Sequence, residues 1–510
     1  MQKTRTQKAI KNVSITMLCQ IIYILVNIVC RTVFTKALGA KYLGLNGLFS
    51  NILTMLSFVE LGMGNALVYK MYAPLANHDE HMLCVYIQFY KKIYTCIAVI
   101  VAMLGVCVVP FLNYIVDTSN LDINVHLLYV LFLADTVISY LYVYKKMILI
   151  ADQKNYIISI YTQIFNLIMN IVQIIALLIT HNFILYLLIK IVFDWLNNVF
   201  CSQYATREYP YISNKVKEKI SKSDKNELKQ DIKGLFLGKI ASVAFDGTDN
   251  IFISIFVNIA SVGIVSNYTL ILSTINGLLN QAFSSLTASL GNLGVSANKK
   301  DVREVLKKIY FLNVLLYGYF FVGLVLLLRM FVVDIWVGAN YELKWSTIIL
   351  LVSELCLRGI HYPIYITRTA MGLFHQKKYI PPICAAVNIG LDFFLGQKFG
   401  ISGIIFATII SRMITRATDV FVLYWEYFEI PIGVYYINYL KYLLFIISST
   451  LISYHGIYVA NSLPVMSRFV VSICIVTVIY WGLAFVLFFR SNEFGYYYEM
   501  FCKRITRRYK

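Results

Sequence analysis

One face of the first apolar segment carries side chains that can bind a hydrophilic ligand. Thr16, Gln20, Tyr23, Asn27 and Arg31 follow one another at intervals of four, three, four and four residues. On a helix this spacing places them in one stripe, with apolar residues on the other faces. Amides and hydroxyls form hydrogen bonds with polar ligands, and a guanidinium binds phosphate through two parallel hydrogen bonds. The stripe therefore predicts a helix that lines a water-filled cavity.

A second apolar segment, residues 262–288, repeats this pattern. Its polar residues are Ser266, Thr269, Ser273, Asn276, Asn280, Ser284 and Thr287. Serine and threonine in membrane helices also mediate ordinary helix packing. Because Asn276 and Asn280 lie in the same stripe, as Gln20 and Asn27 do in the first segment, we favour contact with a hydrated cavity.

Charged side chains also occur within apolar segments. Lys239, Asp246 and Asp249 lie within reach of one helical face, and Glu354 and Arg358 lie one helical turn apart. The second spacing predicts an ion pair. A charge at the bilayer centre costs roughly 2.5–3.5 kcal/mol on insertion scales, so such residues usually pair or serve function.

Other charges in apolar segments are scattered along the chain. We interpret Asp135, Asp194, Asp392 and Arg412 as single charges, with satisfied structural roles expected for Asp194 and Asp392. Arg368 lies near a predicted helix end, where we expect its long side chain to extend to the membrane surface.

The elements that must position these residues are membrane helices. Of the 510 residues, 59% are hydrophobic and only 14% are charged, whereas soluble proteins carry roughly 25% charged residues. The apolar residues form long continuous runs rather than the alternating pattern of a membrane β-barrel. About fourteen runs approach the roughly 20 residues that a helix needs to span a bilayer. They are residues 13–35, 44–69, 90–112, 125–149, 157–180, 183–204, 234–257, 262–288, 308–330, 346–371, 379–396, 401–424, 436–459 and 466–489.

Basic residues alternate between successive connections. The N-terminus, residues 214–233 and the C-terminal tail are rich in lysine and arginine, and the intervening connections are short and poor in cations. Because short basic loops stay on the cytoplasmic side, both termini are predicted to be cytoplasmic. Loops that face anionic lipid then explain the formal net charge of +19, and no nucleic-acid partner is needed.

This orientation makes the cations at the end of the first segment unexpected. Lys36 and Lys41 fall on the outer side, and Arg31 lies about 27 Å along its helix. An arginine at that depth also reaches the interface by extending its side chain. We favour binding of an anionic head group, because Arg31 completes the polar stripe and two further cations follow it.

The two halves of the chain resemble each other. ADQKNYI (151–157) recurs as FHQKKYI (374–380), in each case after the fourth helix of its half. Repeated halves are typical of transporters, whose substrate site lies where the repeats meet. The predicted organisation is a six-helix N-lobe at 1–204, a basic linker at 205–233, a six-helix C-lobe at 234–425, an extra helix pair at 426–490 and a basic tail at 491–510.

No motif indicates catalysis, a cofactor or a metal. GLFLGK (234–239) has one residue too few between its glycines for a phosphate-binding loop, and HDEH (78–81) is typical of a solvated charge cluster. The ten cysteines lie mostly inside apolar runs, without the spacing of a disulfide framework or a zinc site. We therefore expect no enzyme activity and no cofactor.

Three blocks of sequence resemble bacterial polysaccharide exporters of the Wzx type, in the multidrug/oligosaccharidyl-lipid/polysaccharide (MOP) exporter superfamily. The blocks are residues 40–67, 145–157 and 245–271, and the resemblance covers about residues 10–425. It implies a MATE/MOP-like two-lobed bundle of twelve core helices around a central cavity, with the last helix pair added.

The resemblance also implies a substrate and a location. Such exporters flip undecaprenyl-pyrophosphate-linked oligosaccharides across the bacterial cytoplasmic membrane for surface polysaccharide assembly, and their partners are membrane lipids and other assembly proteins. Related flippases hold the pyrophosphate with cavity arginines, a role that Arg31 matches on the first helix. Residues 262–288 contain no arginine, so Lys239 or Arg358 is expected to replace it. The candidate cavity residues are Arg31, Asn27, Gln20, Lys36, Lys239, Asp246, Asp249, Asn276, Asn280, Arg358 and Glu354.

Two other functions are compatible with the sequence. A multidrug or cation antiporter of the same superfamily would use Asp246 and Asp249 as ion sites. A membrane glycan polymerase or ligase would carry a large outer loop with catalytic groups, whereas the outer connections here are short. We rank the exporter first and the enzyme last.

Overall fold

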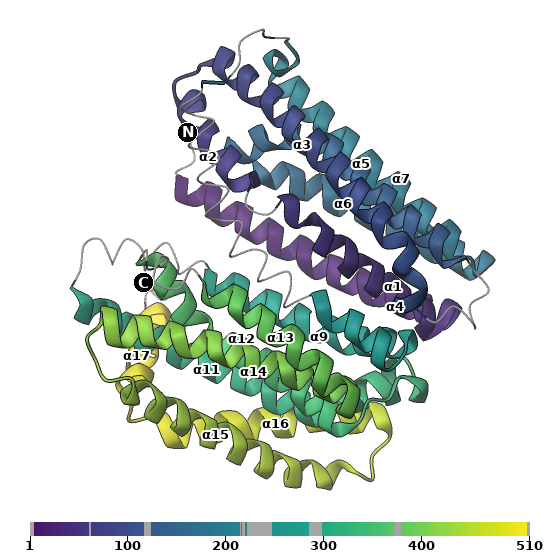
Figure 1. The fold of residues 1–510 in the computed structure, drawn as a ribbon. Helices are drawn as coiled ribbons and strands as arrows, with labels where there is room; N and C mark the ends of the chain where they lie inside the picture. The colour runs from purple at the N-terminus through teal and green to yellow at the C-terminus, as the bar shows by residue number, and fades with distance from the viewer. Residues whose placement is uncertain are drawn as a thin grey trace. The chain divides into compact units, whose positions relative to one another are not determined.

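All regular secondary structure in the described residues is helical (Figure 1). The computed structural model describes residues 5–60, 63–116, 124–152, 154–214, 216, 220–221, 247–284, 298–371, 373 and 379–506, and in the first helix it describes side chains from residue 26. Ten helices in these ranges are long and apolar enough to cross a membrane. Large apolar side chains such as Ile179 and Val478 are exposed on them, as expected for surfaces that face lipid. The predicted all-α class is confirmed.

The chain forms two compact units, and the first comprises Met1–Gly263. Its helices are α1 (Arg5–Leu56), α2 (Met63–Ala76), α3 (Glu80–Val108), α4 (Leu112–Ile115), α5 (Val125–Ala151), α6 (Asn155–Thr180) and α7 (Phe183–Glu208). Helix α5 packs against α3 and α7, and α6 packs against α1 and α7. Asn124 and Asn182 accept hydrogen bonds from the first backbone N–H groups of α5 and α7, which satisfies donors that a helix leaves unpaired.

Gly39 joins the first two predicted spans. The chain is helical on both sides of Gly39, whose φ of 83° lies in the left-handed region that glycine adopts without steric penalty. The predicted second span, 44–69, is wrong at its end, because the α-helix stops at Leu56 and a 3₁₀ turn, η1 (Ser57–Glu60), follows. The Thr54 and Ser57 hydroxyls donate to carbonyls four residues earlier, a pattern that bends helices.

A close helix crossing follows this kink. A Cβ atom at Gly44 would lie 1.9 Å from the carbonyl oxygen of Ile259, and one at Gly263 would lie 2.0 Å from that of Ala40. Only glycine fits such positions, so the second segment of α1 and the beginning of α9 (Ile259–Ser284) approach backbone to backbone.

The second unit comprises Ile264–Lys510. Besides most of α9, its helices are α11 (Lys299–Arg329), α12 (Trp345–Ala370), α13 (Ile380–Phe399), α14 (Ile401–Val420), α15 (Gly433–Ile457), α16 (Val465–Phe488) and α17 (Asn492–Thr506). Helix α12 packs between α11 and α14, and α15 and α16 pack against each other and against α11. Helices α11 and α14 continue as π-helical turns, η4 (Met330–Trp336) and η7 (Phe421–Tyr427).

The predicted spans agree closely with most of these helices. The span 157–180 corresponds to α6, and the span 466–489 corresponds to α16. The C-terminal segment differs from the prediction of a basic tail alone, because it contains α17. The Tyr497 hydroxyl donates to the Lys308 carbonyl of α11 at 3.1 Å and so attaches α17 to the bundle.

Candidate functional site

A group of half-buried charges lies between α12 and α14 in the second unit. Nη2 of Arg358 lies 2.9 and 3.0 Å from the two carboxylate oxygens of Glu354, so the predicted ion pair is confirmed. From α14, Nε of Arg412 lies 3.2 Å from Oε1 of Glu354. One carboxylate therefore links the two helices.

Arg416 joins this group, one helical turn after Arg412. It interacts electrostatically with Glu354, Arg412 and Arg358, and its buried Nη1 atom has no hydrogen-bond partner among the described residues. We call Glu354, Arg358, Arg412 and Arg416 the arginine cluster. Three guanidinium groups lie around the Glu354 carboxylate, so cations outnumber carboxylates among these four residues. A phosphate would offset this charge through charge-assisted hydrogen bonds.

A groove of about 330 Å³ lies beside Arg416, between α12, α14 and α15. Its lining is mostly apolar and includes Met413 and Ile414 of α14 and the rings of Tyr435 and Tyr439 of α15. Arg416 places a guanidinium in this lining. The groove therefore suits a ligand that combines an apolar chain with an anionic end.

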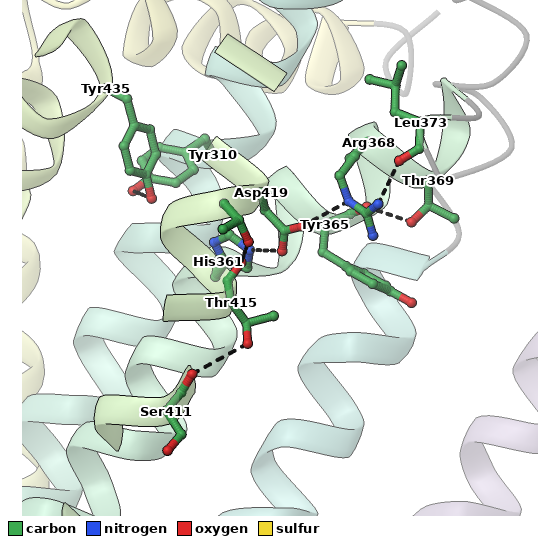
Figure 2. Close-up of polar contacts among 11 residues, drawn as sticks. Tyr310, His361, Tyr365, Arg368, Thr369, Leu373, Ser411, Thr415, Asp419 and Tyr435 are labelled. Carbon is green, nitrogen blue, oxygen red and sulfur yellow. Dashed lines mark hydrogen bonds and ion pairs between the residues drawn. The ribbon is translucent and has the colours of Figure 1, made fainter. Parts of the chain in front are cut away.

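A second ion network connects α12 and α14 (Figure 2). Asp419 lies 2.8 Å from Nε2 of His361 and 2.9 Å from Nε of Arg368, and Nη1 of Arg368 donates to the Leu373 carbonyl at 2.7 Å. Arg368 is only 9% exposed. The expectation that Arg368 extends to the membrane surface is wrong, because Asp419 holds its side chain inside the bundle.

The first unit contains a group of different composition, Asp135, Lys190 and Asp194, which we call the lysine cluster. The Lys190 ammonium of α7 contacts Asp135 of α5 and lies 2.9 Å from Asp194, one turn away on its own helix. Lys146 donates to Asn198 at 2.6 Å and interacts electrostatically with Asp194. The two aspartates are therefore not single charges, and two lysines balance them.

A cavity of about 430 Å³ adjoins the lysine cluster, lined by residues 50–57 and by α5 and α7. Its uncharged lining residues are Ser50, Leu53, Thr54, Ser57, Phe132, Thr136, Ser139, Tyr140, Asn197 and Asn198. The hydroxyls of Thr54, Ser57, Thr136 and Ser139 donate to backbone carbonyls of the preceding helical turn. Because each donor is used, these hydroxyls offer oxygen acceptors to the cavity.

The remaining sequence-predicted residues lie elsewhere. Arg31 and Asn27 are half-buried on α1 and both make polar contacts, whereas Lys36 is exposed. Asp249 is also half-buried and makes a polar contact. The side chains of Gln20, Lys239 and Asp246 lie outside the described residues.

Two amides of the predicted stripe in α9 contact α11. The Tyr317 hydroxyl lies 2.9 Å from Oδ1 of Asn276 and 3.2 Å from Oδ1 of Asn280. The Tyr317 hydroxyl, which has one proton to donate, therefore engages these two amide oxygens in helix packing.

A fully buried carboxylate lies on α13. Oδ2 of Asp392 accepts a hydrogen bond from Nδ2 of Asn388, one turn earlier, at 2.6 Å, which agrees with the structural role expected for Asp392. In the ranges that the structure describes, no group of three or more His, Cys, Asp or Glu residues is arranged to hold a metal.

A further charged group lies at the connection after α5. Lys154 lies 2.8 Å from both Asp152 and Glu208, and the Tyr209 hydroxyl donates to Asp152. Partial burial raises the pKa of Asp152, but the hydrogen bonds from Lys154 and Tyr209 outweigh it and hold this pKa below its usual range. Burial lowers the pKa of Lys154, and the same contacts outweigh that effect and raise it above its usual value.

Sequence reasoning missed Lys190 and Arg416. Each lies four residues from a charge that was noted, Asp194 or Arg412, and this helical spacing is the signal that could have found them. Their contacts across helices have no such signal.

Comparisons with known proteins show what this fold is similar to. No protein-family model matches the chain, and no curated protein matches it in sequence. A structure of the lipid II flippase MurJ in an inward closed conformation aligns with a TM-score of 0.68 and 17% identity, covering 93% of this chain and 98% of that chain. A match over 93% of the 510 residues is longer than residues 1–425, so it must include part of the C-terminal helices.

Two other solved structures share the fold. An inward-facing multidrug resistance MATE transporter of the MOP superfamily aligns with a TM-score of 0.60 and 11% identity, covering 81% of this chain and 98% of that chain. A MOP superfamily transporter from Pyrococcus furiosus aligns with a TM-score of 0.51 and 13% identity, covering 81% and 94%. The chain therefore has the two-lobed, all-helical membrane fold of MOP superfamily transporters and flippases.

Proposed function

We propose that this protein flips undecaprenyl-pyrophosphate-linked oligosaccharide repeat units from the inner to the outer leaflet of the bacterial cytoplasmic membrane, by alternating access, for surface polysaccharide assembly. The arginine cluster carries this proposal. Its three guanidinium groups lie around one carboxylate, and a diphosphate supplies further negative charge and oxygen pairs that match guanidinium groups. Moving isolated charges through hydrocarbon unaided costs tens of kcal/mol, so such a head group needs a protein that replaces its hydration.

The groove beside Arg416 supports a substrate with an apolar tail. Its tyrosine and aliphatic lining is compatible with a prenyl chain, and the guanidinium lies where the charged end of that chain would be. A small soluble anion would leave most of this apolar lining unused.

The fold comparison supports the same reading. MurJ is named as a lipid II flippase, and its match covers 93% of this chain, against 81% for the MATE transporter. The match to MurJ extends into the C-terminal helices. One of these helices, α15, lines the groove beside Arg416. In this proposal Arg31 and Lys36 of α1, with Lys239, supply further cations along the route, both termini are cytoplasmic, and the partners are membrane lipids and polysaccharide-assembly proteins.

Complementation of a deletion strain tests the proposal. We expect an Arg358→Gln/Arg416→Gln variant to restore less than about a tenth of surface polysaccharide, because it removes the excess charge. Arg329→Gln is the matched control, since Arg329 pairs with Glu342 at an exposed position, and it should restore export fully. Full export by a double variant that reaches the membrane in normal amount would contradict the proposal.

A multidrug or cation antiporter is the second candidate, because MATE transporters share the fold. It would use Asp246 and Asp249 as ion sites. Growth of the deletion strain in toxic cations separates the two functions: restored resistance without any effect on surface polysaccharide favours the antiporter.

A further inference from the structure

The cavity beside the lysine cluster has a chemistry that anion binding does not explain. Its aspartates, Asp135 and Asp194, are balanced by Lys190 and Lys146. A cavity without excess positive charge has no electrostatic reason to attract a diphosphate.

The lining is rich in hydrogen-bond acceptors. Thr136 and Ser139 of α5 use their hydroxyl protons on the carbonyls of Phe132 and Thr136, at 3.1 and 2.7 Å. Their oxygens therefore accept rather than donate. Donors come from amides such as Asn197, whose Nδ2 lies 3.3 Å from Thr162.

Apolar and aromatic surface completes the lining. Phe132 and Tyr140 of α5 and Leu53 of α1 lie beside the acceptors. A sugar ring has the matching properties, namely hydroxyl groups around its edge and C–H groups on its faces. A cavity of about 430 Å³ is within the usual range for small-ligand sites and has room for a sugar.

We propose that this cavity is the binding site for an uncharged sugar of the transported saccharide. The assignment rests on the proposed function and adds a substrate preference to it. We expect the cavity to accept uncharged sugars, because its charged lining residues, Asp135, Asp194 and Lys190, already contact one another.

A metal cation fits the same cavity less well. The Lys190 ammonium lies between the two carboxylates that a cation would need, in contact with Asp135 and 2.9 Å from Asp194. A cation would have to displace a tethered positive charge before it could bind.

Binding to the full-length protein in lipid nanodiscs tests the assignment. The probes are undecaprenyl diphosphate alone and the same lipid carrying one uncharged sugar: glucose, galactose or N-acetylglucosamine. We expect at least one glycosylated lipid to bind about ten-fold more tightly than the bare diphosphate, as two or three added hydrogen bonds allow. A Thr136→Val/Ser139→Ala variant should lose this advantage and keep its affinity for the bare lipid.

Thr95→Val is the matched control. Thr95 forms the same type of bond, to the Lys91 carbonyl at 2.8 Å, but on an exposed face of α3, so both affinities should be unchanged. Equal binding of all four lipids by the wild type would overturn the assignment. Binding of radioactive sodium that is abolished in the Thr136→Val/Ser139→Ala variant would overturn it as well. If Arg358→Gln/Arg416→Gln binds the bare diphosphate as tightly as the wild type does, the proposed function fails instead.

Discussion

The lysine cluster and the arginine cluster lie on corresponding helices of the two predicted repeats and have different charge balances. Helices α5 and α7 are the fourth and sixth of the first half, and α12 and α14 are the fourth and sixth of the second. In the first half Lys190 and Lys146 balance two carboxylates, whereas in the second three guanidinium groups surround one carboxylate. The same pair of helix positions thus holds a balanced group in one unit and an excess of cations in the other.

This difference in charge balance suggests that the lysine cluster contributes to stability and the arginine cluster to ligand binding. In a balanced group each charge already has a counter-charge, so the group is stable whether or not a ligand is present. Three half-buried guanidinium groups around one carboxylate repel one another, and an anion that binds there relieves this repulsion. We therefore expect substitutions in the two clusters to have different consequences.

The largest effect is expected from removing Glu354, the one carboxylate of the arginine cluster. Glu354→Gln removes the carboxylate that the three guanidinium groups share, and losing one partner of a mostly buried pair such as Arg412–Glu354 costs about 3–5 kcal/mol. The measurement is thermal unfolding of the purified protein in detergent. Glu304→Gln, which breaks the partly exposed Lys307–Glu304 pair, is the control and should cost less than about 1 kcal/mol. Similar small changes in both variants would show that the cluster is not under electrostatic stress.

A smaller loss is expected from Lys190→Met, which leaves Asp135 and Asp194 facing each other. Lys146 and the adjoining cavity reduce the repulsion between the two carboxylates. We therefore expect the free energy of unfolding to fall by about 2–3 kcal/mol. Adding Asp135→Asn to the same chain should recover most of it, since the charges are then balanced again. No recovery in the double variant would mean that Lys190 acts through packing alone.

The smallest effect is expected at Asp152, outside the membrane helices, and it supplies a baseline for the two buried clusters. Because the pKa of Asp152 is lowered in the folded protein, its contribution is present above the unfolded pKa of about 4. The contribution is lost as the pH falls through the lower folded value. Asp152→Asn should cost a few tenths of a kcal/mol at pH 7, and the difference from wild type should vanish once the pH is below the lowered pKa of Asp152. A difference that persists in acid would exclude an electrostatic origin.

Much of the fold could be predicted because membrane helices are encoded locally. Continuous apolar runs gave boundaries within a few residues for α6 and α16. The Glu354–Arg358 pair was also predictable, since both residues lie on one helix, one turn apart. The break after Leu56 was not, because a membrane run contains no apolar signal for a change from α to 3₁₀ geometry.

The charge clusters could not be assembled from the sequence because they join different helices. Whether Arg412 meets Glu354, or Lys190 meets Asp135, depends on how each helix is rotated in the bundle. Arg368 shows the same limit: its place near a helix end suggested exposure, and only the packing of α12 against α14 brings Asp419 to it. The roles predicted for Gln20, Lys239 and Asp246 remain predictions.

Flipping by the purified protein in proteoliposomes tests the central claim most directly, namely that the excess arginines hold the anionic head group. The substrate is undecaprenyl pyrophosphate carrying the host's own repeat unit, and the readout is its appearance in the opposite leaflet. We expect Arg358→Gln/Arg416→Gln to flip about 100-fold more slowly than wild type without loss of thermal stability. Equal rates in the two proteins would contradict the account.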